Sequence, residues 1–159
     1  MTAQIPEKLR LNGEILALCT EPLADYFAAL EPPPEFAVNC TALWRGYVGT
    51  WEIRDARLFL IDIEAEYPDG RAVSLAGLFP AYPQRVFARW YSGTLRCPRS
   101  GLLEYVHMGY ASVHEEDLLL HVENGIVVSR EVRVNGTAEA NARQGYRPAA
   151  FTTFPRNRK

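Results

Sequence analysis

The sequence has little of what would place it in a specialised class of protein. Its 159 residues hold only three cysteines, Cys19, Cys40 and Cys97, with no Cys-x-x-Cys pair among them. This odd number and wide spacing argue against a disulfide framework and a zinc motif, so we expect reduced thiols. No apolar run reaches the roughly 20 residues of a membrane helix, and the first residues lack a signal-peptide core. We therefore expect a cytoplasmic protein without membrane contact.

Motifs of known enzymes are missing as well. The chain has no Gly-x-Ser-x-Gly elbow and no glycine-rich phosphate loop. Its net charge of −2 gives no drive toward nucleic acid, although residues 135–159 carry five basic side chains against one acidic side chain. We predict no metal and no cofactor, do not expect nucleic acid as a partner, and favour a binding protein over an enzyme.

What the sequence does contain is strand-forming residues, above all between positions 44 and 66. Arg45–Ile53 and Leu58–Ile63 predict two strands joined by a reversal at Asp55 and Ala56. Gly49 indicates a bulge or a close approach in the first of these strands. Along and after the second strand, every other side chain is acidic and is expected to face water, namely those of Asp62, Glu64 and Glu66.

The rest of the chain also favours strands. Asn-Gly pairs at 12–13 and 124–125 predict two tight hairpins. Other strands are expected at 71–75, 85–91, 95–97, 102–108, 110–114 and 118–122, with an exposed turn at 115–117. We predict a β-rich α+β protein whose single domain covers residues 1–134, with a mostly antiparallel sheet rolled into a barrel or sandwich.

One short helix interrupts this pattern. Leu23, Phe27 and Leu30 have helical spacing, Thr20 is placed to cap the helix, and the prolines at 32–34 would end it. Residues 76–84 contain two prolines and a glycine and indicate a loop. Residues 135–159 lack periodicity and indicate a basic, mobile tail.

Two functional hypotheses follow. The acidic row of Asp62, Glu64 and Glu66 suits a partner protein with a basic surface, so the leading hypothesis is a non-enzymatic interaction domain of the immunity or regulatory type. The alternative is an enzyme or sensor for a nucleotide or other anion, because arginine forks and aromatic rings bind such ligands. Its binding residues would be Arg45, Tyr47, Trp51, Arg89, Trp90 and Arg96. A plainer interpretation places the tryptophans in the core, with arginines extended over them.

An enzyme would also need acid–base groups, for which His107, Glu115 and Glu116 are the candidates. The three histidines, at positions 107, 114 and 121, do not have a recognised metal-ligand spacing. Arg45, then Ser92 and Thr94, then Glu115 or Glu116 resemble in their order the motifs of ADP-ribosyltransferases, which implies a nucleotide substrate. The final Glu-x-Glu of that family is replaced here by Glu-Glu-Asp.

Longer stretches carry a different resemblance. LWRGYVGTWEI and LLEYVHMGY are similar to segments of a set of small soluble bacterial proteins without an assigned activity. That likeness implies a compact bacterial cytosolic domain and no particular site residues. Gly49-Thr50-Trp51 also resembles the Gly-x-Trp motif of lipocalins, which implies a barrel.

Overall fold

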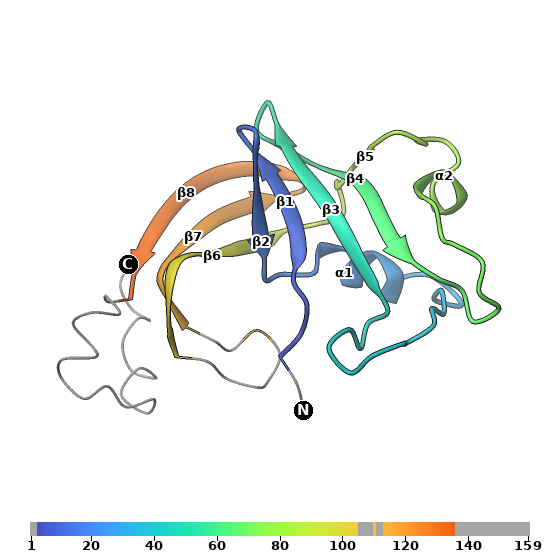
Figure 1. Ribbon diagram of the computed structural model, residues 1–159. Coiled ribbons are helices and arrows are strands. Elements are labelled where there is room, and N and C mark those ends of the chain that lie inside the picture. Colours follow the sequence, from blue (N-terminus) through green and yellow to red (C-terminus); the bar gives the residue numbers. More distant parts are fainter. Residues whose placement is uncertain (1–2, 105–109, 111–112, 136–159) are drawn as a thin grey trace.

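The computed structural model is built on one bent eight-stranded sheet (Figure 1). It describes residues 3–104, 110 and 113–135. The sheet order is β2-β1-β3-β4-β8-β7-β6, and β5 pairs with β4 beside this path. The strands are β1 Glu7–Leu11, β2 Glu14–Leu18, β3 Tyr47–Arg54, β4 Arg57–Ala65, β5 Val86–Phe87, β6 Gly93–Glu104, β7 Val113–Glu123 and β8 Ile126–Val134. The helices are α1, Pro22–Ala28, and α2, Leu75–Leu78.

This architecture confirms the predicted β-rich class. The sheet does not close into a barrel, and its two halves, β1–β4 and β6–β8, face each other as in a sandwich (Figure 1). One apolar core fills the space between them, and side chains from both halves are completely buried in it, including those of Leu9, Trp51, Leu60, Leu95 and Leu118. Of the predicted tail, only Asn135 lies within the described residues.

Three predicted hairpins are confirmed, each with its turn in the left-handed conformation. Asn12 and Gly13 connect β1 to β2 with φ of 52° and 84°, and Asn124 and Gly125 connect β7 to β8 with φ of 50° and 83°. The central turn uses less favourable residues, since Asp55 and Ala56 have φ of 53° and 60°. In all three, positive φ at both turn positions matches the twist of the flanking strands.

Several predicted boundaries are wrong because tertiary contacts override local patterns. The expected turn at 115–117 lies inside β7, where these residues pair with β6 and β8. The expected strand at 71–75 is reduced to one bridge, Glu66 to Ala72, and α2 begins at Leu75, the last residue of that expected strand, and extends into the predicted loop 76–84. The strand expected at 85–91 is only Val86–Phe87. Residues 105–108 of the predicted strand 102–108 lie outside the described residues.

Helix α1 is confirmed, but its predicted cap is wrong. Glu21 occupies the cap position without a side-chain hydrogen bond, and Pro22 begins the helix, where a missing N–H does no harm. Leu23 and Phe27 are buried in the core, whereas Leu30 lies beyond the helix end and is exposed. No helix in the described part of the chain is long and apolar enough to cross a membrane.

Thr20 instead joins the two ends of the sheet. Its hydroxyl accepts the N–H of Arg96 at 2.9 Å, and the Cys19 N–H donates to the Arg96 carbonyl at 2.8 Å, so β2 meets β6 at this point. Followed from strand to strand across the sheet, the pairings make β2 and β6 antiparallel. The next pair of residues after Cys19 and Arg96 that could exchange hydrogen bonds would therefore be Ala17 and Pro98. Proline has no N–H to donate, so the ladder stops there and the sheet stays open.

The strained central turn offers a direct test of the fold. Replacing Ala56 with glycine removes a Cβ from the left-handed conformation and is expected to stabilise the protein by about 1 kcal/mol. The control is Ala24→Gly at an exposed position of α1, which is expected to destabilise by about 1 kcal/mol. Urea unfolding measures both changes, and a loss of stability in Ala56→Gly would contradict the turn geometry.

Candidate functional site

A buried carboxylate lies at the contact of β1 with β3. Glu7 is completely buried and accepts four hydrogen bonds from nitrogen donors. Arg45 donates from Nε at 3.1 Å and from Nη2 at 2.8 Å, both to Oε2. The Gly49 backbone N–H donates to Oε2 at 2.9 Å, and Trp51 Nε1 donates to Oε1 at 3.0 Å. Both oxygens of this carboxylate therefore have donors inside the protein.

Gly49 is required by this carboxylate. A Cβ on Gly49 would lie 2.6 Å from Glu7 Oε1 and 3.0 Å from Trp51 Nε1, closer than atoms of neighbouring side chains approach. The predicted close approach at Gly49 is thus confirmed. The pairing of β3 with β4 also shifts register next to it, between Thr50 and Trp51. Sequence reasoning missed Glu7, although its position two residues before Leu9 on a strand places it on the inward face.

The charges of this pair are set by burial and by each other. Burial raises the pKa of Glu7 above its ordinary value. The Trp51 N–H, the Arg45 charge and the Gly49 N–H lower this pKa, but the effect of burial is larger. The pKa of Arg45 is raised because the attraction and hydrogen bonds of Glu7 outweigh its own desolvation. Since every group that contacts the Glu7 oxygens is a donor, we infer a carboxylate paired with a guanidinium at neutral pH.

Polar contacts continue from this pair into the other half of the molecule. Arg45 Nη1 lies 3.9 Å from Glu21 Oε2, and the Tyr110 hydroxyl donates to the same oxygen at 2.7 Å. Arg96 then donates from Nη1 to the Tyr110 carbonyl at 2.8 Å and from Nε to Asp117 at 3.2 Å. Asp117, which is 2% exposed, also accepts from Arg133 at 2.7 Å. A chain of charged groups therefore links β1 and β3 to β6, β7 and β8.

This arrangement places four of the six predicted ligand-binding residues in structural roles. Arg45 and Trp51 bind Glu7, and Arg96 binds Asp117. Tyr47 is buried beneath Arg45, whose guanidinium carbon lies 5.3 Å from the centre of its ring, and burial raises the pKa of its hydroxyl. These side chains are held by the protein itself, whereas Arg89 and Trp90 lie elsewhere.

Arg89 and Trp90 lie in an aromatic pocket of about 470 Å³ between α1, β4, β5 and the loop after α2. We define the aromatic pocket by its lining residues, which are Tyr26, Phe59, Phe79, Tyr82, Arg85, Val86, Phe87, Arg89 and Trp90. Its volume lies within the range of small-molecule sites. Only Arg89 and Trp90 among them were predicted to bind a ligand, because the pocket combines elements that lie far apart in the chain.

The wall of the aromatic pocket is rigid and its rim is basic. Trp90 donates from Nε1 to the Pro22 carbonyl at 2.8 Å, and its ring lies parallel to that of Phe79, with planes 6° apart and centres 6.4 Å apart. Arg85 lies over the Phe59 ring at 4.8 Å. No acidic side chain is among the lining residues, and neither Arg85 nor Arg89 has an ion pair within the described chain. Two guanidinium groups are thus available beside aromatic surface.

Of the candidate catalytic residues, the two that the structure describes, Glu115 and Glu116, do not line this pocket. His107 lies outside the described residues, Glu115 is half-buried, and Glu116 pairs with Arg99 at 3.3 Å. The residues of the ADP-ribosyltransferase-like order are likewise engaged separately, Arg45 with Glu7 and Thr94 with His121. His121 also contacts Glu131 through Nε2 at 2.9 Å. In the described ranges, no three His, Cys, Asp or Glu side chains are grouped to hold a metal ion.

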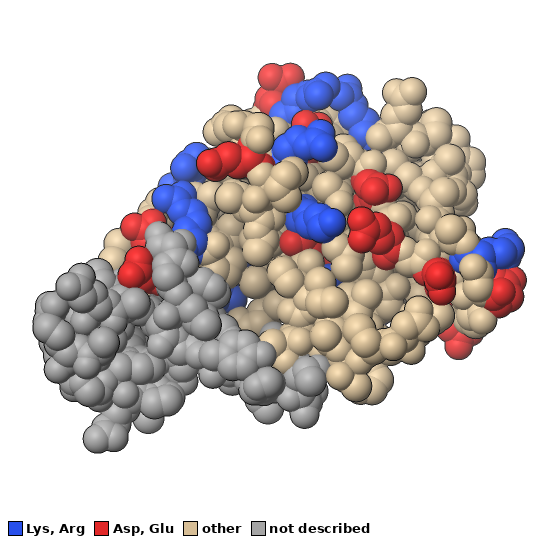
Figure 2. All heavy atoms as spheres, in the orientation of Figure 1, with Lys and Arg blue, Asp and Glu red and all other residues tan. Residues whose placement is uncertain are grey.

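The acidic row is at the surface, as predicted. Asp62, Glu64 and Glu66 are all exposed, and Glu64 lies 3.5 Å from Lys8 of β1. Figure 2 shows basic and acidic side chains intermingled on this face of the molecule. The row is therefore part of a mixed charged surface and not a purely acidic patch.

Comparisons with known proteins identify no relative: no family model, no curated protein and no solved structure matches this chain.

The buried ion pair predicts a large, specific loss of stability. Glu7→Gln leaves Arg45 without its counter-charge and places the NH2 group of the new amide against groups that are themselves donors. We expect the free energy of unfolding to fall by about 3–5 kcal/mol. Glu64→Gln breaks an ion pair too, but an exposed one, and is expected to cost less than about 1 kcal/mol. Guanidinium unfolding of the two variants compares them, and equal losses would show that burial does not set the strength of the Glu7 pair.

Buried thiol and phenol groups predict a loss of stability in alkali. Burial raises the pKa of Cys97 to about 12, with Cys19 and Asp117 adding to it, and burial also raises the pKa of Tyr91 to about 12. The unfolded chain releases these protons at lower pH than the folded protein, so stability falls as pH rises above about 9. We expect a loss of about 3 kcal/mol between pH 8 and pH 10.5.

Two cysteine variants test this alkaline effect. Cys97→Ala removes the buried thiol and is expected to flatten the fall in stability with pH, leaving the part due to buried phenols such as Tyr91 and Tyr47. Cys40→Ala removes an exposed thiol and is expected to leave the fall unchanged. Urea unfolding across the pH series provides the measurement, and an identical slope in all three proteins would rule out Cys97 as the source.

Proposed function

We propose that the protein is a binding domain for a small aromatic anion, such as a nucleotide or an aromatic carboxylate, and that the aromatic pocket holds this ligand. The observation that carries the proposal is the pair of arginines, Arg85 and Arg89, beside an aromatic pocket that contains no carboxylate. An arginine fork binds carboxylate or phosphate through paired hydrogen bonds. A flat apolar ring would bury itself against the aromatic side chains.

The interior arginines of the described chain are less suited to bind a ligand. Arg45 and Arg96 already donate to buried carboxylates, and displacing either would leave a buried charge without its partner. In the aromatic pocket, by contrast, a ligand would replace only water around Arg85 and Arg89. This difference favours the pocket over the interior as the place where an anion binds.

A basic protein partner at the acidic row is the second candidate. Its support is the exposure of Asp62 and Glu64 on β4 and of Glu66 directly after it. The neighbouring Lys8 already neutralises part of this charge, so the acidic row would attract a basic surface less strongly than its sequence suggests. The aromatic pocket is therefore the better supported site.

Matched ligand pairs test the aromatic-anion proposal. Indole-3-acetate is compared with its neutral analogue indole-3-acetamide, and AMP with adenosine, by isothermal titration calorimetry. At least one anion is expected to bind about ten-fold more tightly than its neutral analogue, a difference of about 1.4 kcal/mol. The double variant Arg85→Gln, Arg89→Gln is expected to lose that preference while still binding the neutral compound.

The control is Arg54→Gln, which removes an exposed arginine of β3 that does not line the pocket. It is expected to keep the preference for the anion. The proposal fails if neither anion is preferred to its neutral analogue, or if the double variant discriminates as well as the unchanged protein.

A further inference from the structure

A second concave site lies where β2 and β6 separate. Beyond their junction at Cys19 and Arg96, the two strands enclose a groove of about 580 Å³, which we call the β2–β6 groove. Leu11 and Leu16 of the first hairpin and Leu118 of β7 give it an apolar floor. It shares no lining residue with the aromatic pocket, so it is independent of the proposed function.

The edge of β2 presents unpaired backbone to this groove. The two-residue turn makes Leu11 and Glu14 a hydrogen-bonded pair, so the N–H groups of Glu14, Leu16 and Leu18 point toward β1. Those of Ile15 and Ala17 therefore point away from β1, in the same direction as the Cys19 N–H that reaches β6. Among the described strands, β1 is the only one that pairs with β2.

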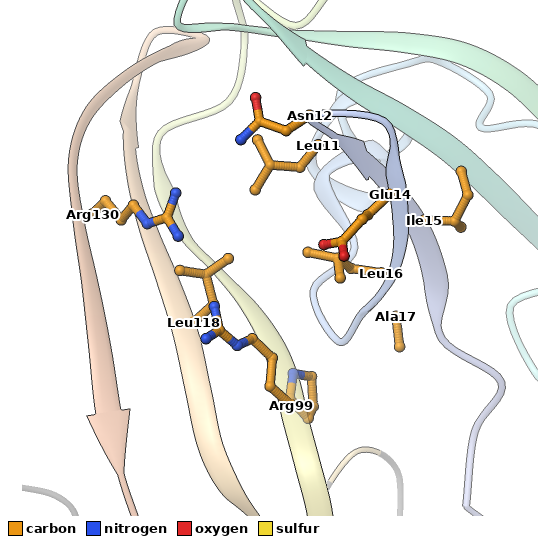
Figure 3. Close-up of a pocket in the computed structure, with 10 residues that line it drawn as sticks. Leu11, Asn12, Glu14, Ile15, Leu16, Ala17, Arg99, Leu118 and Arg130 are labelled. Atoms are coloured by element: carbon orange, nitrogen blue, oxygen red, sulfur yellow. The ribbon is translucent and has the colours of Figure 1, made fainter.

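Charge and apolar surface occur together on the opposite wall. Arg99 of β6 and Arg130 of β8 project into the groove, across from the Glu14 carboxylate (Figure 3). Arg99 is paired with Glu116, whereas Arg130 has no ion pair within the described residues. Val132, two residues along the same face of β8, is 43% exposed although the Leu118 side chain opposite it is fully buried. This face lacks the cover that the rest of the sheet receives.

We propose that the β2–β6 groove binds an extended peptide segment of a partner protein, which pairs as an added strand with the free edge of β2 and directs an acidic side chain to Arg130. Strand addition to an open edge uses backbone hydrogen bonds for affinity and alternate side chains for specificity. Here the inward side chains would meet Leu16, Leu118 and Arg130.

Pro98 keeps this position open for a partner. Pro98 has no N–H to donate to the Ala17 carbonyl opposite it, so β6 does not continue its ladder along the β2 edge that carries the N–H groups of Ile15 and Ala17. A small anion would neutralise Arg130, but it would leave the facing backbone edges of β2 and β6 unpaired and Val132 exposed. The combination of a free strand edge, an apolar floor and an unpaired arginine fits a peptide.

Designed peptides test the proposal on the full-length protein. The probe is a fluorescein-labelled peptide of alternating Val and Asp, about six residues long, the usual length of a strand. One comparison peptide has Lys in place of Asp, and another has N-methyl groups on its central amides, which remove the backbone donors. Fluorescence anisotropy is expected to give dissociation constants at least about ten-fold weaker for both comparison peptides.

Variants and hydrogen exchange locate the binding. Arg130→Glu is expected to weaken binding of the Asp peptide by at least about ten-fold. The charge-matched control Arg54→Glu, on the outer surface, is expected to bind as the unchanged protein does. In the complex, the amides of Ile15 and Ala17 are expected to exchange more slowly.

Four results would overturn the proposal: equal binding of the N-methylated peptide, equal binding of the Lys peptide, unchanged affinity in Arg130→Glu, or unaltered exchange of Ile15 and Ala17. A fifth result that would overturn it is failure of the Asp peptide to bind at a concentration of about 1 mM. Because calorimetry with aromatic anions reads the other pocket, either proposal can fail while the other stands.

Discussion

The buried ion pair between Glu7 and Arg45 is the interaction on which this structure depends. A carboxylate without solvent is tolerated only where donors surround it, and here they come from three places: the Arg45 guanidinium, the Gly49 backbone and the Trp51 indole. These contacts fix the parallel contact of β1 with β3, the only parallel pairing among the described strands. They also require glycine at position 49.

The same polar chain explains how an open sheet holds its two halves together. Apolar packing fills the interior without direction, whereas the contacts from Arg45 through Glu21, Tyr110 and Arg96 to Asp117 join particular atoms of opposite halves. The backbone contact between Cys19 and Arg96 adds one point of closure. Beyond it, Pro98 ends the ladder, and the resulting gap is the β2–β6 groove.

Arginine has opposite roles in the interior and at the surface of this protein. Arg45, Arg96 and Arg133 are committed to buried acids, so they stabilise the fold. Arg85, Arg89 and Arg130 line surface cavities and have no ion pair within the described residues. The proposed binding of an aromatic anion and of an acidic peptide both follow from this division. Position in the fold, and not residue type, separates the two groups.

Local sequence by itself determined the hairpins, the β-rich class, helix α1 and the exposure of the acidic row, because each follows from turn residues or from the period of nearby side chains. Only the tertiary structure decided that Asp117 is buried within β7 and not in a turn, since Arg96 and Arg133 from neighbouring strands neutralise it. It also decided that Arg89 and Trp90 line the aromatic pocket, whereas Arg45 and Arg96 lie outside it. Those outcomes depend on contacts between residues far apart in the chain, which no local period encodes.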